Sequence, residues 1–405
     1  MLKDLSRFKI KSDRTMKRSF KKKMENGNIL VLTLYVLGIP VVNKQKQRKT
    51  LRIIHMLSLI FGQFFTLYSL ATYVFDLANF CDNLSCSKMV LSLMIWEISL
   101  IMNRYSIYSK RIQIKGLLES FENIQRVYKY KLGKNMIIIN VLTIVFLTFS
   151  VTYLGLIMLC FFVDRNESEE WFDDLTFNSN ITVSFPIKVS FNIIYIVSTR
   201  LFRLVTPQFL TIFYIQWCLI LNRLVKQCIE ELRISFHTSN KHCIIQHFMR
   251  NYSVLHELHL MVESALSMEI FWLMASHFII VFAMLSKVLG FFGYFDLILD
   301  IENTIFFFLD TISLFSIIFF ASRVNKEDER IRDKVKDIAF HLSLVKETKE
   351  TSKLLIRYIQ SKRHLVLTAW GIFQFKKNFL FTSVGVLITY NLLILQLNTP
   401  SAQEK

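Results

Sequence analysis

The chain has 405 residues, of which 53% are hydrophobic and 20% charged, and its formal net charge is +18. Its mean hydropathy of +0.38 is typical of membrane proteins and excludes an ordinary water-soluble domain. Because the basic residues flank apolar runs, we attribute the charge to membrane topology and expect no nucleic-acid partner. With ten glycines, four prolines and no runs of alternating polar and apolar residues, the sequence predicts long helices and no β-barrel.

The N-terminal region, residues 1–50, is basic and polar before its first apolar run, which is unlike a signal peptide. That apolar run, Asn28–Val42, has 15 residues and is too short to cross a bilayer. Basic residues lie on both sides of it. We therefore expect a cytoplasmic N-terminus whose apolar segment lies in the inner membrane interface.

Seven further segments are long and apolar enough to cross a bilayer, and they predict an all-α membrane protein with seven transmembrane helices. The predicted spans are Met56–Phe75, Met89–Tyr108, Met136–Val163, Val189–Leu221, Ile270–Phe295, Thr304–Ser322 and Asn378–Leu397. Most of the Lys and Arg residues, 42 of 49, lie in four segments beside these spans: residues 1–52, 104–134, 222–263 and 323–377. By the positive-inside rule these segments are cytoplasmic, so the N-terminus is inside and the C-terminus is extracellular.

Sequons for N-linked glycosylation give a second test of this orientation. Asn83, Asn166 and Asn180 each begin an Asn-x-Ser/Thr sequon in a loop that we predict to be outside. Asn251 begins a fourth sequon in a predicted cytoplasmic segment and should carry no glycan.

The cysteines divide between the two sides of the membrane. Cys81 and Cys86 share the first outside loop, an oxidising location, and are candidates for a disulfide. Cys160 lies near the same face and could compete for either partner. The remaining cysteines are predicted to be internal and reduced: Cys218, Cys228 and Cys243.

Several ionisable residues lie within predicted spans, where such groups are rare and usually face a cavity or each other: Glu97, Arg200, Arg203, Lys287 and Asp310. Arg200 and Arg203 are about one helical turn apart and could meet a carboxylate such as Glu97. One interpretation makes Glu97, both arginines and Asp310 candidates for a ligand pocket. The more common alternative is structural pairing, or snorkelling for Lys287. Pro207 follows in the same span and should kink it.

Five histidines lie between the fourth and fifth spans: His237, His242, His247, His256 and His259. Membrane di-iron oxidases use histidine boxes, but a second box is missing here, and so is the carboxylate–histidine pattern of a zinc protease. The sequence also has no Gly-rich phosphate loop and no nucleophile elbow. We therefore predict neither an enzyme nor a metal or other cofactor, and interpret the segment as a basic amphipathic extension of the fourth span.

The segment between the sixth and seventh spans is charged yet periodic. Its apolar residues repeat with alternating spacings of four and three: Ile331, Val335, Ile338, Leu342 and Val345. This pattern predicts a cytoplasmic amphipathic helix with a coiled-coil-like seam, or a helix packed on its own subunit. The chain is thus divided into a bundle of six spans at 51–322, cytoplasmic helices at 323–376, and a last helix with the C-terminus at 377–405.

The last span has an unusual polar residue near its end. Residues 378–400 hold no charge, and Thr389, Leu393, Gln396 and Leu397 follow one helical stripe. An amide that faces lipid costs free energy, whereas one that faces water or a partner helix does not. The stripe therefore suits a water-filled path with an apolar gate, or else one interhelical hydrogen bond in an ordinary bundle.

The end of this span resembles the signature that ends insect gustatory receptors, Thr-Tyr, five hydrophobic residues and Gln-Phe. Here Thr389-Tyr390 is followed by a mostly apolar run and then Gln396. Leu397 replaces the final Phe, and Asn391 breaks the apolar run. Two other stretches also look like elements of that family: Thr368-Ala369-Trp370-Gly371-Ile372-Phe373 and Leu37-Gly38-Ile39-Pro40.

The resemblance implies a tastant-gated, non-selective cation channel in the plasma membrane of a sensory neuron. It implies a homo- or heterotetramer with other gustatory receptors, surrounded by membrane lipids, with cytoplasmic helices that join the subunits. The inverted orientation argues against a G-protein-coupled receptor. The remaining alternatives are a membrane transporter and a metabotropic receptor without its own conductance.

The resemblance also implies roles for individual residues. Leu393 and Leu397 would form the gate and Gln396 would line the pore, while Thr389 and Tyr390 would pack the motif helix. The sugar-sensing branch of the family tends to carry Glu after the motif Tyr, where this chain has Asn391. That difference favours a bitter or other non-sugar tastant.

Overall fold

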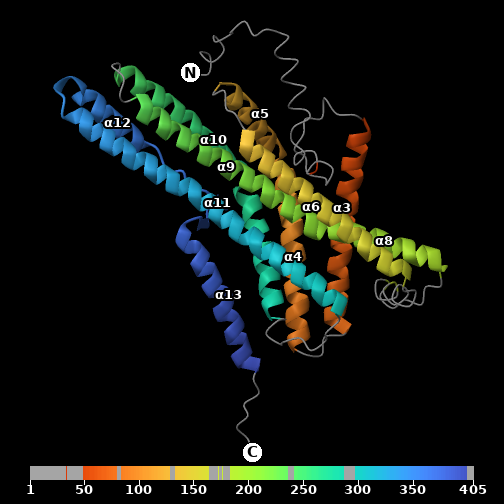
Figure 1. The fold of residues 1–405 in the computed structure, drawn as a ribbon. Helices are drawn as coiled ribbons and strands as arrows, with labels where there is room; N and C mark the ends of the chain where they lie inside the picture. The colour runs from red at the N-terminus through yellow and green to blue at the C-terminus, as the bar shows by residue number, and fades with distance from the viewer. Residues whose placement is uncertain are drawn as a thin grey trace, which may run out of the picture.

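The computed structural model describes residues 33, 49–79, 84–127, 133–163, 172, 176, 183–235, 241–286 and 297–398. Nearly all of these residues are helical (Figure 1). The α-helices are α3 (Lys49–Asn79), α4 (Leu84–Ser109), α5 (Arg111–Val127), α6 (Gly133–Val163), α8 (Phe185–Arg200), α9 (Thr206–Ser235), α10 (Lys241–Ser286), α11 (Leu297–Ser343), α12 (Lys349–Ser361) and α13 (Lys377–Asn398). A π-helix, η2 (Leu201–Val205), joins α8 to α9, and a short 3-10 helix, η4 (Lys346–Thr348), precedes α12.

A small hairpin departs from the predicted all-α fold. Strands β1 (Thr368–Ala369) and β2 (Phe373–Gln374) pair antiparallel, with Thr368 opposite Gln374. The turn between them contains Trp370 and Gly371 with φ of 52° and 70°. A positive φ suits glycine but is unusual for tryptophan, so contacts around the turn must hold this backbone shape.

Each predicted span falls on a helix of the structure over its described residues. Within the residues that the structure describes, five helical stretches are long and apolar enough to cross a membrane: Ile53–Phe75, Ile138–Gly155, Phe185–Arg233, His242–Leu285 and Thr304–Ser343. The other two predicted spans lie in α4 and α13, and α13 has a shorter apolar stretch, Phe381–Tyr390. The protein is thus a multi-pass helical membrane protein, while the count of seven spans and their orientation stay predictions.

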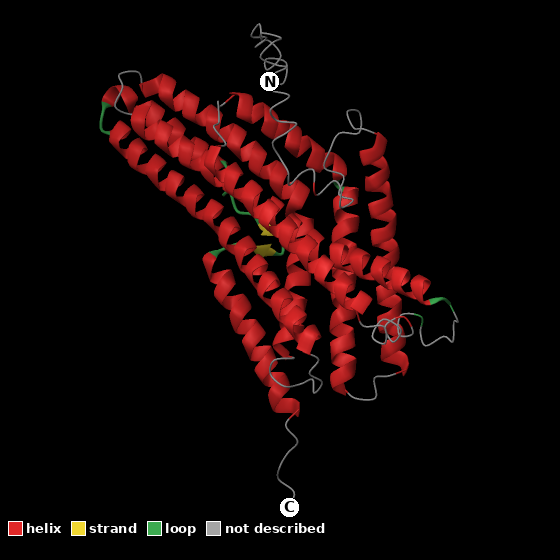
Figure 2. Ribbon diagram, turned by 45° about the vertical axis from the view of Figure 1, so that its right-hand side comes forward, coloured by secondary structure: helices red, strands yellow, loops and turns green. Residues whose placement is uncertain are grey.

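Two helices are much longer than a bilayer requires. Helices α10 and α11 have 46 and 47 residues, so each continues far beyond its predicted span. The predicted domain boundary at 322–323 therefore falls inside one continuous helix. Helix α11 packs against α9, α10 and α12, and α12 folds back along it (Figures 1 and 2).

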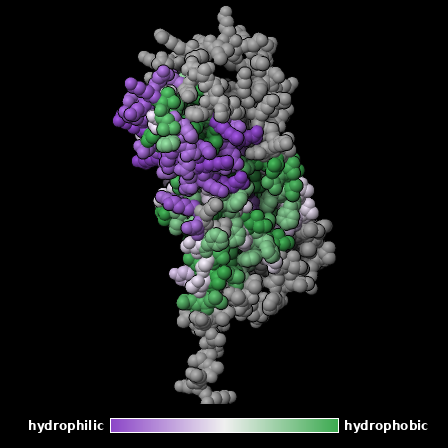
Figure 3. All heavy atoms as spheres, turned by 60° about the vertical axis from the view of Figure 1, so that its left-hand side comes forward, coloured by the Kyte–Doolittle hydropathy of each residue, from purple (hydrophilic) through white to green (hydrophobic). Residues whose placement is uncertain are grey.

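The surface separates into polar and apolar parts. Hydrophilic residues gather over the end of the molecule where α12 lies, and hydrophobic residues dominate below it (Figure 3). Large apolar side chains are exposed along α3 and α6, for example Ile60, Phe64, Val145 and Val151. Such surfaces suit contact with lipid tails.

The main apolar core joins α9, α10, α11 and α12, with Phe209, Trp217 and Tyr252 fully buried in it. The seam predicted on α11 contributes to this core because Ile331 and Val335 are both 0% exposed. Most of the seam thus packs on its own subunit, which is the second of the two interpretations of that pattern.

Candidate functional site

An irregular turn in the middle of the fourth span positions the first group of candidate residues. The π-helix η2 lies directly before Thr206 and Pro207. Proline has no backbone N–H, and the Thr206 hydroxyl donates a hydrogen bond to the Leu201 carbonyl at 3.0 Å. A π-turn adds a residue to one turn and so changes the direction of the side chains that follow it. Arg203 lies inside this turn, whereas Arg200 precedes it.

A buried ion pair joins the second span to the π-turn. Glu97 on α4 is fully buried and pairs with Arg203. The Arg203 guanidinium lies 5.5 Å from the centre of the Tyr73 ring and 5.6 Å from that of Trp96. An arginine and a carboxylate between two aromatic rings form a polar centre with apolar walls, which is the composition of many ligand sites.

A second arginine borders this centre. Arg104 on α4 lies 4.3 Å from the centre of the Phe202 ring and donates a hydrogen bond to the Thr66 hydroxyl at 3.2 Å. Within the described part of the chain, its Nη2 atom is buried and makes no hydrogen bond. Arg104 lies within the predicted span Met89–Tyr108, but it was counted with the basic segment 104–134 and was not predicted as a site residue.

Asp310 belongs to a different polar cluster. Its carboxylate accepts a hydrogen bond from Gln208 at 3.0 Å and lies 2.7 Å from His277 Nδ1. The other ring nitrogen of His277 is 3.2 Å from the Thr211 hydroxyl, and Ser313 bonds to Gln208. These residues connect α9, α10 and α11 in the bundle interior. Asp310, an ionisable residue within a predicted span, was the sequence signal for this cluster, whereas its partner His277 was not predicted.

The four predicted pocket residues therefore do not converge. Glu97 and Arg203 are paired, Arg200 lies 5.5 Å from the Phe306 ring on α11, and Asp310 is in the separate cluster. A small cavity between α4, α9 and α10, lined by residues such as Phe213, has a volume of about 20 Å³. That volume is enough for about one water molecule and not for a tastant.

The predicted pore helix α13 is only loosely covered by its own chain. Ser383 and Leu387 are buried against the bundle, whereas Tyr390 and Leu393 are 59% and 49% exposed. Thr389 is exposed as well, so the expected packing of Thr389 and Tyr390 does not occur within the single chain. Gln396 and Leu397 belong to α13, but their side chains lie outside the described part of the structure.

Some predictions fall on parts of the chain that the structure does not describe. These are the sequons at Asn83, Asn166 and Asn180, the side chains of Cys81 and Cys86, the apolar segment 28–42 apart from Thr33, and Lys287. Asn251 is described and is buried. Its side-chain amide donates to Glu231 at 2.9 Å and lies 3.1 Å from His247 Nε2. A glycan could not attach to Asn251 without breaking these contacts.

Over its described residues, the histidine-rich segment forms the first part of α10 (Lys241–Ser286). It therefore extends the fifth span, and not the fourth span as predicted, because α9 ends at Ser235. His242 lies 3.0 Å from the Gln246 amide, and His256 and His259 are buried with ring centres 6.4 Å apart. Among the residues that the structure describes, there is no group of three or more side chains that could hold a metal ion.

These observations define a multi-pass helical membrane protein, and its fold is that of a solved insect olfactory receptor, which agrees with the fold that the sequence resemblance implies. The structure of the olfactory receptor OR5 from Machilis hrabei in complex with eugenol has a TM-score of 0.64 at 12% identity, covering 91% of this chain and 97% of that one. A second structure of that receptor has a TM-score of 0.62 at 13% identity, covering 96% and 100% of the two chains. No protein-family model matches the chain, and no curated protein matches it either.

Proposed function

We propose that the protein is a gustatory receptor that works as a ligand-gated, non-selective cation channel in the plasma membrane. The observation that carries this proposal is the shared fold, which covers 96% of this chain in one comparison with an insect olfactory receptor. The motif at Thr389, Tyr390 and Gln396 favours the gustatory branch. Asn391, in place of the glutamate of sugar sensors, favours a bitter or other non-sugar tastant.

We infer that α13 lines the pore of a tetramer, formed with identical or other gustatory receptor subunits. In the single chain this helix contacts α11 and α10 along one stripe, and apolar side chains such as Phe381 and Leu393 stay exposed. A ring of leucines from four subunits would exclude water and block ions when the channel is closed. Leu393 and Leu397 are the proposed gate, and Gln396 supplies the polar lining beside it.

We infer further that the ligand binds beside the Glu97–Arg203 pair. Aromatic rings from Tyr73 and Trp96 border this pair, and the Nη2 atom of Arg104 offers an unused donor close to the same turn. Arg203 lies in the π-turn that leads directly into α9. A small displacement of Arg203 by a ligand would therefore also displace the start of α9. A tastant with a hydrogen-bond acceptor and an apolar body suits this site. Asp310, with His277, is the second candidate position in the bundle.

The experiment that tests the channel function is recording from excised membrane patches without nucleotide. Cells that express the chain, alone or with a gustatory co-receptor, are tested with a panel of bitter compounds and sugars. We expect a cation current that a bitter compound opens within the excised patch. A protein that reaches the surface and responds only in intact cells would be a metabotropic receptor, and uptake of a compound without current would show a transporter.

The ligand site has its own test. Glu97→Gln keeps the shape of the side chain but removes the charge that balances Arg203, so we expect a shift of the ligand concentration for half-maximal current. Glu119→Gln is the matched control because Glu119 is exposed, at 60% of its side chain, on α5. If both variants had the same ligand concentration for half-maximal current at equal surface level, the proposal that the ligand binds beside Glu97 would be wrong.

A further inference from the structure

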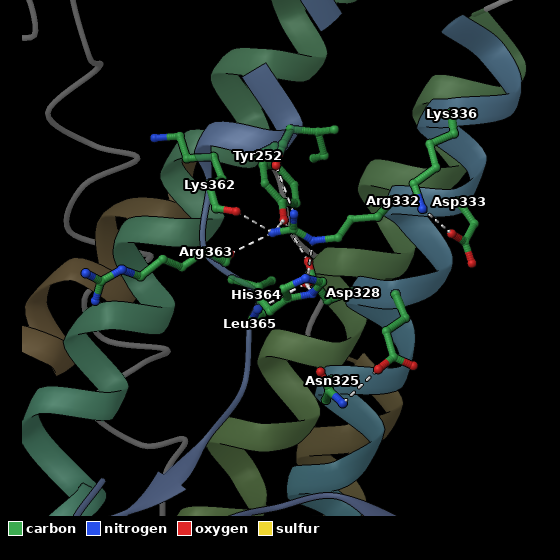
Figure 4. A network of polar contacts seen from close by, with 12 residues as sticks. Tyr252, Asn325, Asp328, Arg332, Asp333, Lys336, Lys362, Arg363, His364 and Leu365 are labelled. Atoms are coloured by element: carbon green, nitrogen blue, oxygen red, sulfur yellow. Dashed lines mark hydrogen bonds and ion pairs between the residues drawn. The ribbon is translucent and has the colours of Figure 1, made fainter. Parts of the chain in front are cut away.

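A network of polar contacts surrounds the segment that leads into the last helix (Figure 4). Asp328 and Arg332 lie one turn apart on α11, in the part beyond the predicted sixth span, and they are 0% and 8% exposed. Arg332 Nε donates to an Asp328 oxygen at 2.9 Å, and the Tyr252 hydroxyl of α10 donates to the other oxygen at 2.6 Å. Both charges are thus buried but satisfied.

The other hydrogen bonds of Arg332 and Asp328 in this network are made with main-chain atoms. Arg332 donates to the carbonyl oxygens of Ile359 at 2.9 Å, Lys362 at 2.9 Å and Arg363 at 2.7 Å. The Leu365 N–H donates to Asp328 at 3.1 Å. Two side chains of α11 therefore hold the end of α12 and the irregular segment after it, and they supply partners for carbonyls that a helix end leaves open.

A second set of contacts holds the same segment a few residues later. Thr368 N–H donates to Glu263 of α10 at 3.0 Å, and Trp370 N–H donates to the Ser267 carbonyl at 2.9 Å. These bonds hold the turn whose φ angles are positive. Phe375 is fully buried, and α13 begins two residues later at Lys377. The path from α12 to α13 is thus tied to both long helices.

Helix α12 is itself fixed on α10. The Tyr358 hydroxyl donates to the Met249 carbonyl at 2.6 Å. A tyrosine phenol is protonated at cellular pH, and burial raises the pKa of Tyr358 further, so its hydroxyl remains able to donate. The segment that Arg332 holds therefore follows a helix that is bonded to α10.

We infer that Arg332 and Asp328 are positioning residues that clamp the main chain at the base of α13. The part of the last helix that can move then begins beyond Lys377. This inference rests on the proposed channel function for its consequence in current. A buried ion pair adds little net stability compared with apolar residues of the same size, but it fixes directions. Here the fixed direction is that of the main chain leading into the helix that lines the proposed pore.

Limited proteolysis tests the clamp without any current. Arg363 is exposed on irregular backbone, so it would be a good trypsin site if its peptide were not held. Asp328→Asn removes the charge that orients Arg332. Arg332→Lys keeps the charge, but its donors share one nitrogen, so it cannot reach Asp328 and all three carbonyls at once. Losing a charged hydrogen bond should raise cleavage after Lys362 or Arg363 by about 10- to 100-fold in solubilised protein.

The control is Asp333→Asn on the same helix. Asp333 pairs with Lys336 at 3.0 Å, and both side chains are about 70% exposed, as Figure 4 shows beside the buried network. This variant should be cut at the wild-type rate. Size-exclusion profiles must match for all variants, and Tyr252→Phe, which loses only a hydroxyl, serves if Asp328→Asn does not fold.

Resting sodium current then tests the consequence for α13. At equal surface level, Asp328→Asn and Arg332→Lys should raise the ligand-free current several-fold, because a loose base misaligns the closed ring, while Asp333→Asn should not. Unchanged cleavage in the clamp variants would overturn the clamp. Faster cleavage with unchanged current would overturn its role in positioning α13. If wild-type protein carries no current under any condition, the proposed channel function fails, and proteolysis alone decides the clamp.

Discussion

The first span approaches the π-turn closely at Gly62. A Cβ atom added there would lie 2.7 and 2.8 Å from two atoms of the Phe202 ring and 2.9 Å from Arg104 Nη1. Phe202 is only 6% exposed, and the Arg104 guanidinium covers its ring, so neither group can move away freely. We therefore predict that Gly62→Ala forces α3 away from η2 and weakens both the fold and the Glu97–Arg203 centre.

The magnitude follows from two opposing effects. Overpacking of this kind costs about 1–3 kcal/mol. Alanine is better than glycine in a helix by about 1 kcal/mol, which offsets part of that cost. At Gly116 nothing lies within 4 Å of an added Cβ, so Gly116→Ala keeps the whole helix gain. The two variants should therefore differ by about 1–3 kcal/mol, with Gly62→Ala the less stable.

The assay is the temperature at which solubilised protein loses its single size-exclusion peak after heating. Gly62→Ala should lose the peak below the wild-type temperature or near it, and Gly116→Ala at or above it. In channel recordings, Gly62→Ala should also require more ligand. If Gly62→Ala were as heat-resistant as Gly116→Ala, the close approach of α3 to η2 would be wrong.

The remaining predictions concern the pore and the orientation. Leu397→Ala should leak current without ligand because the smaller side chain leaves a wider opening in the closed ring. Unchanged resting current at normal surface level would contradict the gate. Gln396→Glu should favour divalent cations, as carboxylate rings do, which reversal potentials in mixed solutions would show. Asn166→Gln or Asn180→Gln should increase gel mobility by the loss of a glycan, and Asn251→Gln should not; a shift with Asn251→Gln alone would reverse the topology.

The sequence predicted the Glu97–Arg203 pair as a candidate because an ionisable group inside an apolar span must find a partner. It could not tell Arg203 from Arg200, since a regular helix places both on one face and the π-turn has no sequence signature that we recognised. The partners of Asp310 were missed for another reason. His277 and Gln208 are 33 and 102 residues away from it, and no local pattern reports such contacts.

The clamp at Arg332 shows a further limit. Its acceptors are main-chain carbonyls, and every residue has one, so the sequence of 359–365 contains nothing that marks them. The helical seam on α11 could be predicted because the spacing of its apolar residues can be counted in the sequence. Whether Ile331 and Val335 face their own subunit or another one depends on packing, and only the structure decided it.

The π-turn at residues 201–205 has a consequence for how related sequences should be compared. A π-turn is one residue longer than the α-turn it replaces, so it arises by a single insertion. A relative without it should show a one-residue gap here when it is aligned to this chain. Alignment without that gap would shift every position of the following helix by about 100°, and would match residues buried in one receptor with residues exposed in the other.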